Sequence, residues 1–244
     1  MSNALVLENN AIDNTSLVNS ELANPDLKSV NHATPPHNGV IGDDPVVLAN
    51  IYEQALNIAV WQRQLTPETQ QAVADLVAGH PIFRSSMTLR VDDALTGLID
   101  ELQYKEPTNH LARDIAQLVD MFGCLFELTR VGIRITVLSK AMCPKFHVDN
   151  VPCRLVTTYV GDATEWLPNK GIDRTKLGHG SEGRADHESG LYNHQRDIQQ
   201  LNAGDIALLK GERWEGNEDT GLIHRSPVLK EGDARLLVTL DFSG

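Results

Sequence analysis

The sequence predicts an α+β protein in which a helical N-terminal region is followed by a jelly-roll barrel or sandwich of β-strands. From residue 44 to about residue 128, apolar residues recur at helical spacing. From residue 129 onward, short segments rich in β-branched residues are separated by Gly, Pro and Asp turns. A chain of 244 residues is long enough to bury a large core. We therefore expect an arm over residues 1–43, a helical region over 44–128 and a β domain over 129–244.

Residues 1–43 are rich in Asn, Ser, Asp and Pro and show little apolar periodicity. The stretch His32–Gly39, with its two adjacent prolines, is typical of turns and linkers. We expect a flexible arm. Its start lacks the basic segment and apolar block of a secretion signal, and no apolar run in the chain approaches the ~20 residues that span a bilayer. These features favour a cytoplasmic protein without a membrane partner.

Several helical segments are expected in the region 44–128. Pro45 suits the first turn of the first segment, and Thr66 is a suitable cap for the second. Further helices are expected over Val91–Leu102 and Thr108–Phe126, and the last has an apolar stripe on one face, formed by Leu111, Ile115, Leu118, Val119 and Phe122. No catalytic cluster is evident here, and we expect that this region could mediate a homodimer.

The β domain has its clearest strands at Val131–Leu138, Arg154–Val160, Ile206–Lys210 and Leu236–Phe242. Residues 169–196 lie between the second and third of these strands, and they are rich in Gly, His, Arg and Asp and poor in apolar residues. A loop of this length in a compact domain is often a lid or a binding loop. Its candidate contacts to a substrate are His179, His187, Tyr192 and His194.

The motif with the clearest chemistry is His147-Val148-Asp149, which is followed much later by His224 and then by Arg235. Residues two apart on a strand point to the same side, so His147 and Asp149 can bind one metal ion, with His224 from another strand as the third ligand. Two histidines and one carboxylate are the ligand set of a non-haem Fe(II) site with open coordination positions. The alternative is an ordinary surface pair of His147 and Asp149, with His224 merely packed.

Here the sequence resembles the 2-oxoglutarate/Fe(II) dioxygenase superfamily, whose fold is a double-stranded β-helix, a cupin-like jelly roll. Residues 204–211 are similar to the turn and strand that precede the distal histidine there, and residues 224–242 match the ending of the superfamily. Residues 161–166 are similar to a segment that follows the second strand. The resemblance covers about residues 130–244. The whole chain also looks like a bacterial family described as a domain of unknown function.

The resemblance implies a hydroxylase that uses Fe(II) and takes 2-oxoglutarate as cosubstrate. His147, Asp149 and His224 would bind the iron and form the catalytic centre. The substrate would be a polar small molecule or a peptide side chain. The formal net charge of −12 argues against a nucleic-acid partner, because such proteins neutralise phosphates with basic side chains.

The resemblance also implies that Arg235 pairs with the distal carboxylate of 2-oxoglutarate. Either Thr158 or Tyr159 would share that carboxylate, and since the two are adjacent on a strand, only one of them can face the pocket. The alternative for Arg235 is an ordinary ion pair with Asp233 or Asp241.

Two other functions remain open. Cys143, His147, Asp149 and Cys153 fall within eleven residues and are ligand types that Zn(II) accepts, which would suit a non-redox zinc-binding or metal-handling module. A cupin-like metal-binding barrel without oxygenase activity would use the same histidines and aspartate. It would have no need of a buried cation at Arg235.

Overall fold

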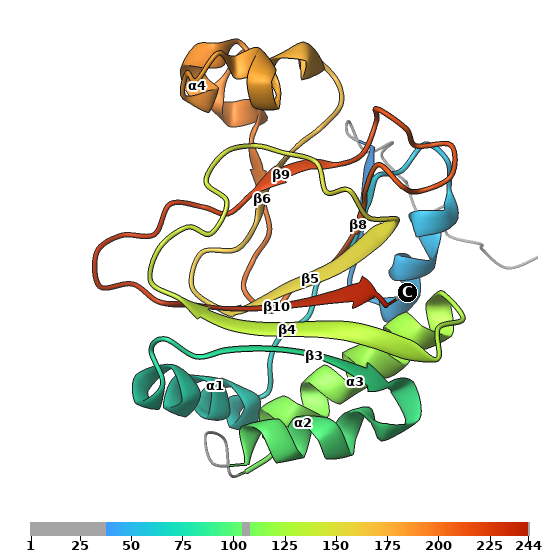
Figure 1. The fold of residues 1–244 in the computed structure, drawn as a ribbon, viewed down its shortest axis with the longest axis vertical. Helices are drawn as coiled ribbons and strands as arrows, with labels where there is room; N and C mark the ends of the chain where they lie inside the picture. Colours follow the sequence, from blue (N-terminus) through green and yellow to red (C-terminus); the bar gives the residue numbers. More distant parts are fainter. Residues whose placement is uncertain (1–37, 104–107, 244) are drawn as a thin grey trace, which may run out of the picture. The chain divides into compact units, whose positions relative to one another are not determined.

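The computed structural model describes residues 38–103 and 108–243. Most of the predicted arm lies outside the described residues, and the last part of it, Gly39–Gly42, forms strand β1. The described residues belong to one compact unit, which contains two β-sheets and a group of helices (Figure 1). No helix in 38–103 or 108–243 combines the length and apolar character needed to cross a membrane.

The larger sheet has the strand order β1-β2-β8-β5-β10-β4-β3 within the described residues. After β1, its strands in sequence order are β2 (Ile58–Trp61), β3 (Arg84–Arg90), β4 (Arg130–Leu138), β5 (Cys153–Val160), β8 (Ile206–Lys210) and β10 (Arg235–Phe242). Strand β10 pairs antiparallel with both β4 and β5 and therefore lies in the middle of the sheet. The four strands that the alternation of apolar residues predicts are confirmed as β4, β5, β8 and β10.

The smaller sheet has the order β7-β6-β9. It consists of β6 (Glu165–Leu167), β7 (Gln199–Gln200) and β9 (Ile223–Arg225). His147, in the connection between β4 and β5, adds an isolated antiparallel bridge to His224 of β9. Along the chain from β4 to β10, segments of the larger and smaller sheets thus alternate.

Helices α1 (Pro67–Gly79), α2 (Ala94–Leu102) and α3 (His110–Leu125) pack on the larger sheet (Figure 1), α1 against β5, α2 against β3 and α3 against β4. The Thr69 N–H donates to the Thr66 hydroxyl at 3.2 Å, which confirms the predicted cap of α1. The predicted stripe of α3 is also confirmed, since Leu111, Ile115, Leu118, Val119 and Phe122 are all buried in the main core. The face of the sheet opposite these helices is left free for the smaller sheet and the site.

The prediction of an all-helical region over 44–128 is wrong in part. Ile58–Trp61, expected to be helical, is strand β2, and Arg84–Arg90 is strand β3, so this region contributes strands to the same sheet as the β domain. Ile58, Ala59 and Val60 are all buried, and a short run of consecutive apolar residues fits a buried strand as well as a helix. The segment after Asp44 is a short 3-10 helix, Pro45–Tyr52.

Residues 169–196, the predicted lid, are folded into short helical turns, including α4 (Asp186–Ser189). In Figure 1 this segment extends from the end of the molecule that carries β6 and β9. Tyr192 packs edge-on against Phe146, with ring centroids 5.9 Å apart, so the segment is anchored beside His147.

Candidate metal centre

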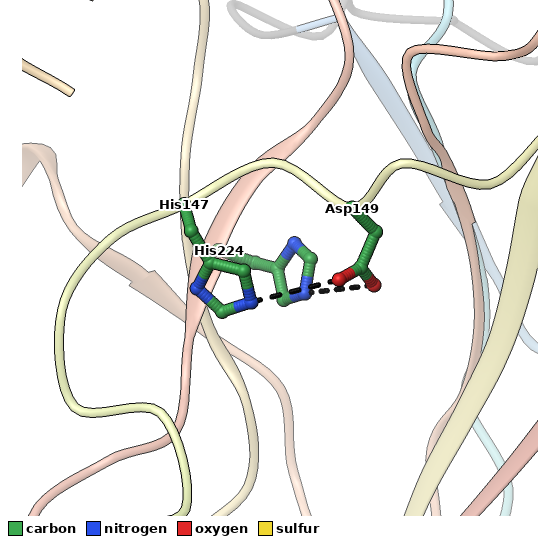
Figure 2. Close-up of side chains that lie close together, drawn as sticks. All are labelled: His147, Asp149 and His224. Carbon is green, nitrogen blue, oxygen red and sulfur yellow. Dashed lines mark ion pairs between the residues drawn. The ribbon is translucent and has the colours of Figure 1, made fainter. Parts of the chain in front are cut away.

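Three potential metal ligands, His147, Asp149 and His224, converge in the structure (Figure 2). The His147 N–H donates to the carbonyl of His224 at 3.0 Å, and the His224 N–H donates to the carbonyl of His147 at 2.9 Å. This reciprocal pair holds the two backbones side by side. Both imidazoles therefore point to the same side and face the carboxylate of Asp149, two residues further along the chain.

The atoms that would bind an ion lie close together. His147 Nε2 is 3.6 Å from Asp149 Oδ1, and His224 Nε2 is 3.3 Å from Asp149 Oδ2. Among the described residues, these three side chains form a group whose ligand atoms all lie within 4.8 Å of one another. Such separations suit three ligands of one first-row transition metal ion, each of which binds at roughly 2.0–2.2 Å.

The hydrogen bonds of the imidazoles favour metal binding through Nε2. His147 Nδ1 lies 3.0 Å from the carbonyl of Lys145, and His224 Nδ1 lies 3.2 Å from the carbonyl of Leu222. A carbonyl can only accept, so each Nδ1 carries the proton and donates it. In each neutral ring, the Nε2 lone pair is then directed toward the shared point, as is usual for metal-binding histidines.

Asp149 is held in place by an ion pair with Arg154. Arg154 Nη1 donates to Asp149 Oδ2 at 2.5 Å, while Arg154 Nε and Nη2 donate to the two oxygens of Asp241 at 2.7 and 3.1 Å. Arg154 is therefore a bridge between β5, β10 and the connection that carries Asp149. Arg154 shares a strand face with Thr158.

The charges of the group are mutually dependent. Burial raises the pKa of the Asp149 carboxyl, but contacts with both histidines and the charge of Arg154 outweigh it and hold this pKa well below its usual range. Burial lowers the pKa of His147, yet its contacts with Asp149 and with the Lys145 carbonyl outweigh this effect, so its pKa is raised. Asp149 is thus ionised at neutral pH and is the natural counter-charge for a cation.

Arg235 is a buried cation without a carboxylate partner among the described residues. It is 1% exposed, and its guanidinium donates to the hydroxyls of Thr158 (3.0 and 3.2 Å), Thr164 (2.9 Å) and Ser226 (3.1 Å). Burial lowers the pKa of Arg235 to about 10, although the charge of Asp162 opposes this shift. A buried charge is costly unless it is paired, so this site suits an anionic ligand.

The ordinary ion pairs considered for Arg235 do not form. Asp241 binds Arg154 and also lies 3.3 Å from Arg134, and the described contacts of Arg235 do not include Asp233. Sequence reasoning missed Thr164 and Ser226 as partners of Arg235, because their hydroxyls meet only through the pairing of separate strands.

A cavity of about 90 Å³ connects Arg235 with the two histidines. Its lining includes His147, His224 and Arg235, together with Arg134 and Arg154 from the larger sheet. The structure therefore brings two of the candidate metal ligands and the Arg235 guanidinium to one cavity. Metal and anion could be held there together.

The alternatives Thr158 and Tyr159 face opposite sides of β5. Thr158 contacts Arg235, whereas the Tyr159 hydroxyl donates to Asp114 Oδ2 of α3 at 2.5 Å. Asp114 also forms a bidentate pair with Arg63, at 2.7 and 2.8 Å. Tyr159 is therefore a link between sheet and helix, and its predicted place beside the cosubstrate is wrong.

Other predicted contacts lie away from the cavity. His179, His187 and His194 are exposed and do not line it. Instead, Asp186 connects the predicted lid to the site: it accepts from the Phe146 N–H and from Arg225, both at 3.0 Å. No signal in the sequence distinguished this aspartate.

The ligand set proposed for zinc does not assemble. Cys153 is fully buried and packs in the core on the helix side of β5, where burial raises the pKa of its thiol far above its usual range. Cys143 is exposed. Within the described part of the chain, the group of potential ligands around His147 and Asp149 includes neither cysteine.

Comparisons with known proteins add a family and a set of similar folds. The model of a family described as "Protein of unknown function (DUF1826)" matches residues 42–241. A search of curated proteins finds no match. The structure is similar to a dioxygenase for auxin oxidation from rice, with 10% identity, a TM-score of 0.46, and coverage of 83% of this chain and 81% of that one.

Two further similar structures have comparable scores. The dioxygenase for auxin oxidation AtDAO1 from Arabidopsis thaliana, in a 2-oxoglutarate complex, has 11% identity and a TM-score of 0.44, with 84% of this chain and 92% of that one covered. A Pseudomonas putida prolyl-4-hydroxylase has 12% identity and a TM-score of 0.42, with 82% and 98% covered.

Proposed function

We propose that this chain, which belongs to the family described as protein of unknown function (DUF1826), is an Fe(II)- and 2-oxoglutarate-dependent oxygenase. One observation carries the proposal. The cavity lined by His147 and His224, whose imidazoles face Asp149, is also lined by a buried guanidinium, Arg235, which has no carboxylate partner among the described residues. A metal-binding barrel without a dicarboxylate cosubstrate would gain nothing from such a cation.

The donor set fits the metal. His147, Asp149 and His224 would hold Fe(II) on one face, and both imidazoles have their Nδ1 protons engaged so that Nε2 is free to bind. When bound, the iron and 2-oxoglutarate supply the dioxygen chemistry that hydroxylates a substrate and yields succinate and carbon dioxide. Asp149 would contribute the negative charge that the cation needs.

Arg235 would bind the distal carboxylate of 2-oxoglutarate in a bidentate, charge-assisted pair. The hydroxyls of Thr158, Thr164 and Ser226 hold the guanidinium in place and could share the same carboxylate. Their role is to orient the cosubstrate toward the two histidines and to keep water from the cation.

The order of the strands supports a double-stranded β-helix as the fold of this half of the chain. From β4 to β10 the chain passes repeatedly between the larger sheet and the smaller sheet, and the bridge at His147 extends the smaller one. In such a barrel the ligands lie between the two sheets, as His147, His224 and Arg235 do. A cytoplasmic location, a homodimer through the helices and the absence of a nucleic-acid partner stay predictions.

The test is an anaerobic titration of the apoprotein with Fe(II) and then with 2-oxoglutarate. We expect a weak visible metal-to-ligand charge-transfer band that appears only when both are present. The band should be lost in His224→Ala and strongly weakened in Arg235→Ala, because the first removes a ligand and the second removes the anchor of the cosubstrate. The matched control is Arg113→Ala, which removes an exposed arginine on α3.

Two results would contradict the proposal. One is that the band does not form in the wild-type protein although Fe(II) binds. The other is that Arg235→Ala leaves the affinity for 2-oxoglutarate unchanged, which would indicate that the guanidinium serves another purpose.

A further inference from the structure

Strands β3 and β4 carry four arginines and no acidic residue, in a chain that has 33 Asp and Glu and a formal net charge of −12. The arginines are Arg84 and Arg90 on β3 and Arg130 and Arg134 on β4, and all four are exposed. Arg90 lies 3.5 and 3.7 Å from Asp93 and Asp92. In the described part of the chain, neither Arg84 nor Arg130 has an ion pair.

The pairing of the strands places these four side chains, called here the arginine face, on the same side of the sheet. Arg90 lies opposite Arg130, and Ser86 lies opposite Arg134. Directly opposed residues share a face, as do residues two apart along a strand. The other face of both strands packs against the helices through the main core, so the arginine face lies on the same side as the metal site.

Arg134 joins the arginine face to the metal site. Its side chain lines the cavity that contains His147 and His224. It lies 3.3 Å from Asp241, which binds Arg154, which in turn binds Asp149. The charge of Arg134 is only partly balanced, since Arg154 occupies both oxygens of Asp241.

A hydroxyl in the same cavity also lacks a partner. Thr239 lines the cavity opposite Arg134, and its Oγ1 is buried without a hydrogen-bond partner in the structure. Buried hydroxyls are nearly always hydrogen-bonded. Thr239 therefore has an unused hydroxyl beside Arg134 in this cavity.

A hollow of about 370 Å³ lies at the Arg84 end of the arginine face. It combines the cations Arg84 and Lys140 with the apolar side chains of Ile82 and Met142, which are 85% and 52% exposed. Met142 also lines the metal cavity, so the hollow and the cavity adjoin at this residue. Exposed apolar side chains next to unpaired cations are typical of a surface that binds another molecule.

We propose that the arginine face binds an acidic polypeptide segment and presents one of its side chains to the metal cavity. The reaction of that side chain at the metal site rests on the proposed function, whereas the binding of the segment to the arginine face does not. The seven residues of β3 span about 20 Å, which is longer than a small metabolite, whereas the cavity of about 90 Å³ admits only a small group. β3 and β4 contain no aromatic residue on which nucleic-acid bases could stack.

The test is a fluorescence-anisotropy titration with the full chain at low and at physiological salt. The probes are a labelled twelve-residue peptide of alternating Glu and Gly, the same peptide with Gln for Glu, and a labelled oligothymidine of equal charge. We expect the Glu peptide to bind, with an affinity that falls as salt rises. The double variant Arg84→Gln/Arg134→Gln should weaken it by about tenfold or more, and Arg113→Gln on α3 should not.

Arg84→Gln alone keeps the test valid if the double variant is unstable, because Arg84 has no described ion pair that supports the fold. Equal binding of the Gln peptide, tighter binding of oligothymidine, or unchanged binding in the arginine variants would each overturn the inference. The charge-transfer titration separates the two proposals. If the band forms but the Glu peptide does not bind, only the proposal of peptide binding by the arginine face is refuted. If the peptide binds as expected but the band never forms, only the proposed oxygenase function is refuted.

Discussion

Thr158 and Tyr159 are neighbours on β5, but their side chains serve different parts of the molecule. The Thr158 hydroxyl accepts from Arg235 in the cavity, and the Tyr159 hydroxyl donates to Asp114 on the helix side. The two positions therefore provide a matched pair of substitutions that each remove one hydroxyl. One substitution should change the affinity for 2-oxoglutarate, and the other should change the free energy of unfolding.

Thr158→Val should weaken 2-oxoglutarate binding by about tenfold, because Arg235 loses one of the hydroxyls that orient it. Tyr159→Phe should leave that affinity unchanged and lower the free energy of unfolding by about 1–2 kcal/mol, because the mostly buried Asp114 loses a donor. The first is measured by calorimetric titration and the second by urea unfolding. An effect of Tyr159→Phe on 2-oxoglutarate affinity would contradict the assignment.

The raised pKa of His147 makes metal binding depend on pH. A proton on Nε2 blocks the lone pair, so metal affinity should increase as pH rises through this pKa, by up to about tenfold per pH unit for one proton. The stability of the apoprotein should change in the opposite sense. The stabilisation from protonated His147 beside Asp149 is fully present below the ordinary histidine pKa of about 6.5 and is lost as pH rises through the raised value.

Metal titrations in two buffers of different protonation enthalpy would measure the released proton directly. Asp149 stays ionised across this range, because its pKa is held well below the usual value. An affinity that does not change between about pH 6 and pH 8 would show that His147 is not the titrating ligand.

At the scale of elements, the end of β8 supports the segment that carries Asp149. The Gly211 N–H donates to the carbonyl of Pro152 at 2.9 Å, and the Glu212 N–H donates to that of Asp149 at 3.0 Å. A Cβ on Gly211 would lie 2.1 Å from the carbonyl oxygen of Val151 and 2.5 Å from that of Asp149. These are backbone atoms, so a side chain at Gly211 cannot be accommodated by a rotamer change.

Gly211→Ala should therefore displace Asp149 and lower the affinity for Fe(II) by about tenfold to a hundredfold. The matched control is Gly79→Ala at the end of α1, where the added Cβ would meet nothing within 4 Å. Metal affinity should be unchanged in the control. Equal affinity in both variants would show that Asp149 is not a ligand or that its segment is easily displaced.

Helices and strands whose apolar residues recur with a clear spacing were predictable from the sequence, and the others were not. Strands β4, β5, β8 and β10 show runs of β-branched or apolar residues, and α3 shows a helical stripe. Strand β2 is a short apolar run buried in the sheet, so its period is ambiguous. Strand β2 pairs with β8, which is far away in the sequence, and the propensities of neighbouring residues do not predict such a pairing.

The same limit applies to the site. The spacing of His147 and Asp149 predicted that they share a side, and the structure brings them together with His224. Whether Thr158 or Tyr159 faces the cavity depends on the register of β5 against β10, which the sequence does not specify. The partners of Arg235 come from three separate segments and become visible only in the fold.

At the scale of the whole molecule, the site joins parts of the chain that are far apart in sequence. His147 and Asp149 precede β5, whereas His224 lies on β9 near the end of the chain. The unfolded chain cannot hold three such ligands around one ion, so metal binding is coupled to folding. The ion should therefore act as a cross-link between β9 and the connection from β4 to β5.

A divalent metal should raise the thermal unfolding midpoint of the wild-type protein. At a hundredfold excess over Kd the gain is about 2.7 kcal/mol, which corresponds to roughly 5–10 °C for a domain of this size. Differential scanning calorimetry with anaerobic Fe(II), or with Mn(II) as a redox-stable substitute, would measure it. His224→Ala should show no such rise, and a rise of equal size in that variant would place the metal elsewhere.

The reciprocal backbone pair between His147 and His224 means that hydrogen–deuterium exchange at two amides can report on the metal site. The amide protons of His147 and His224 are hydrogen-bonded to each other's carbonyls in this bridge. They therefore exchange with deuterium only when the two segments separate. An ion held by both imidazoles would oppose that separation. Slower exchange at these two amides would then measure occupancy by any metal, including one without colour or unpaired electrons.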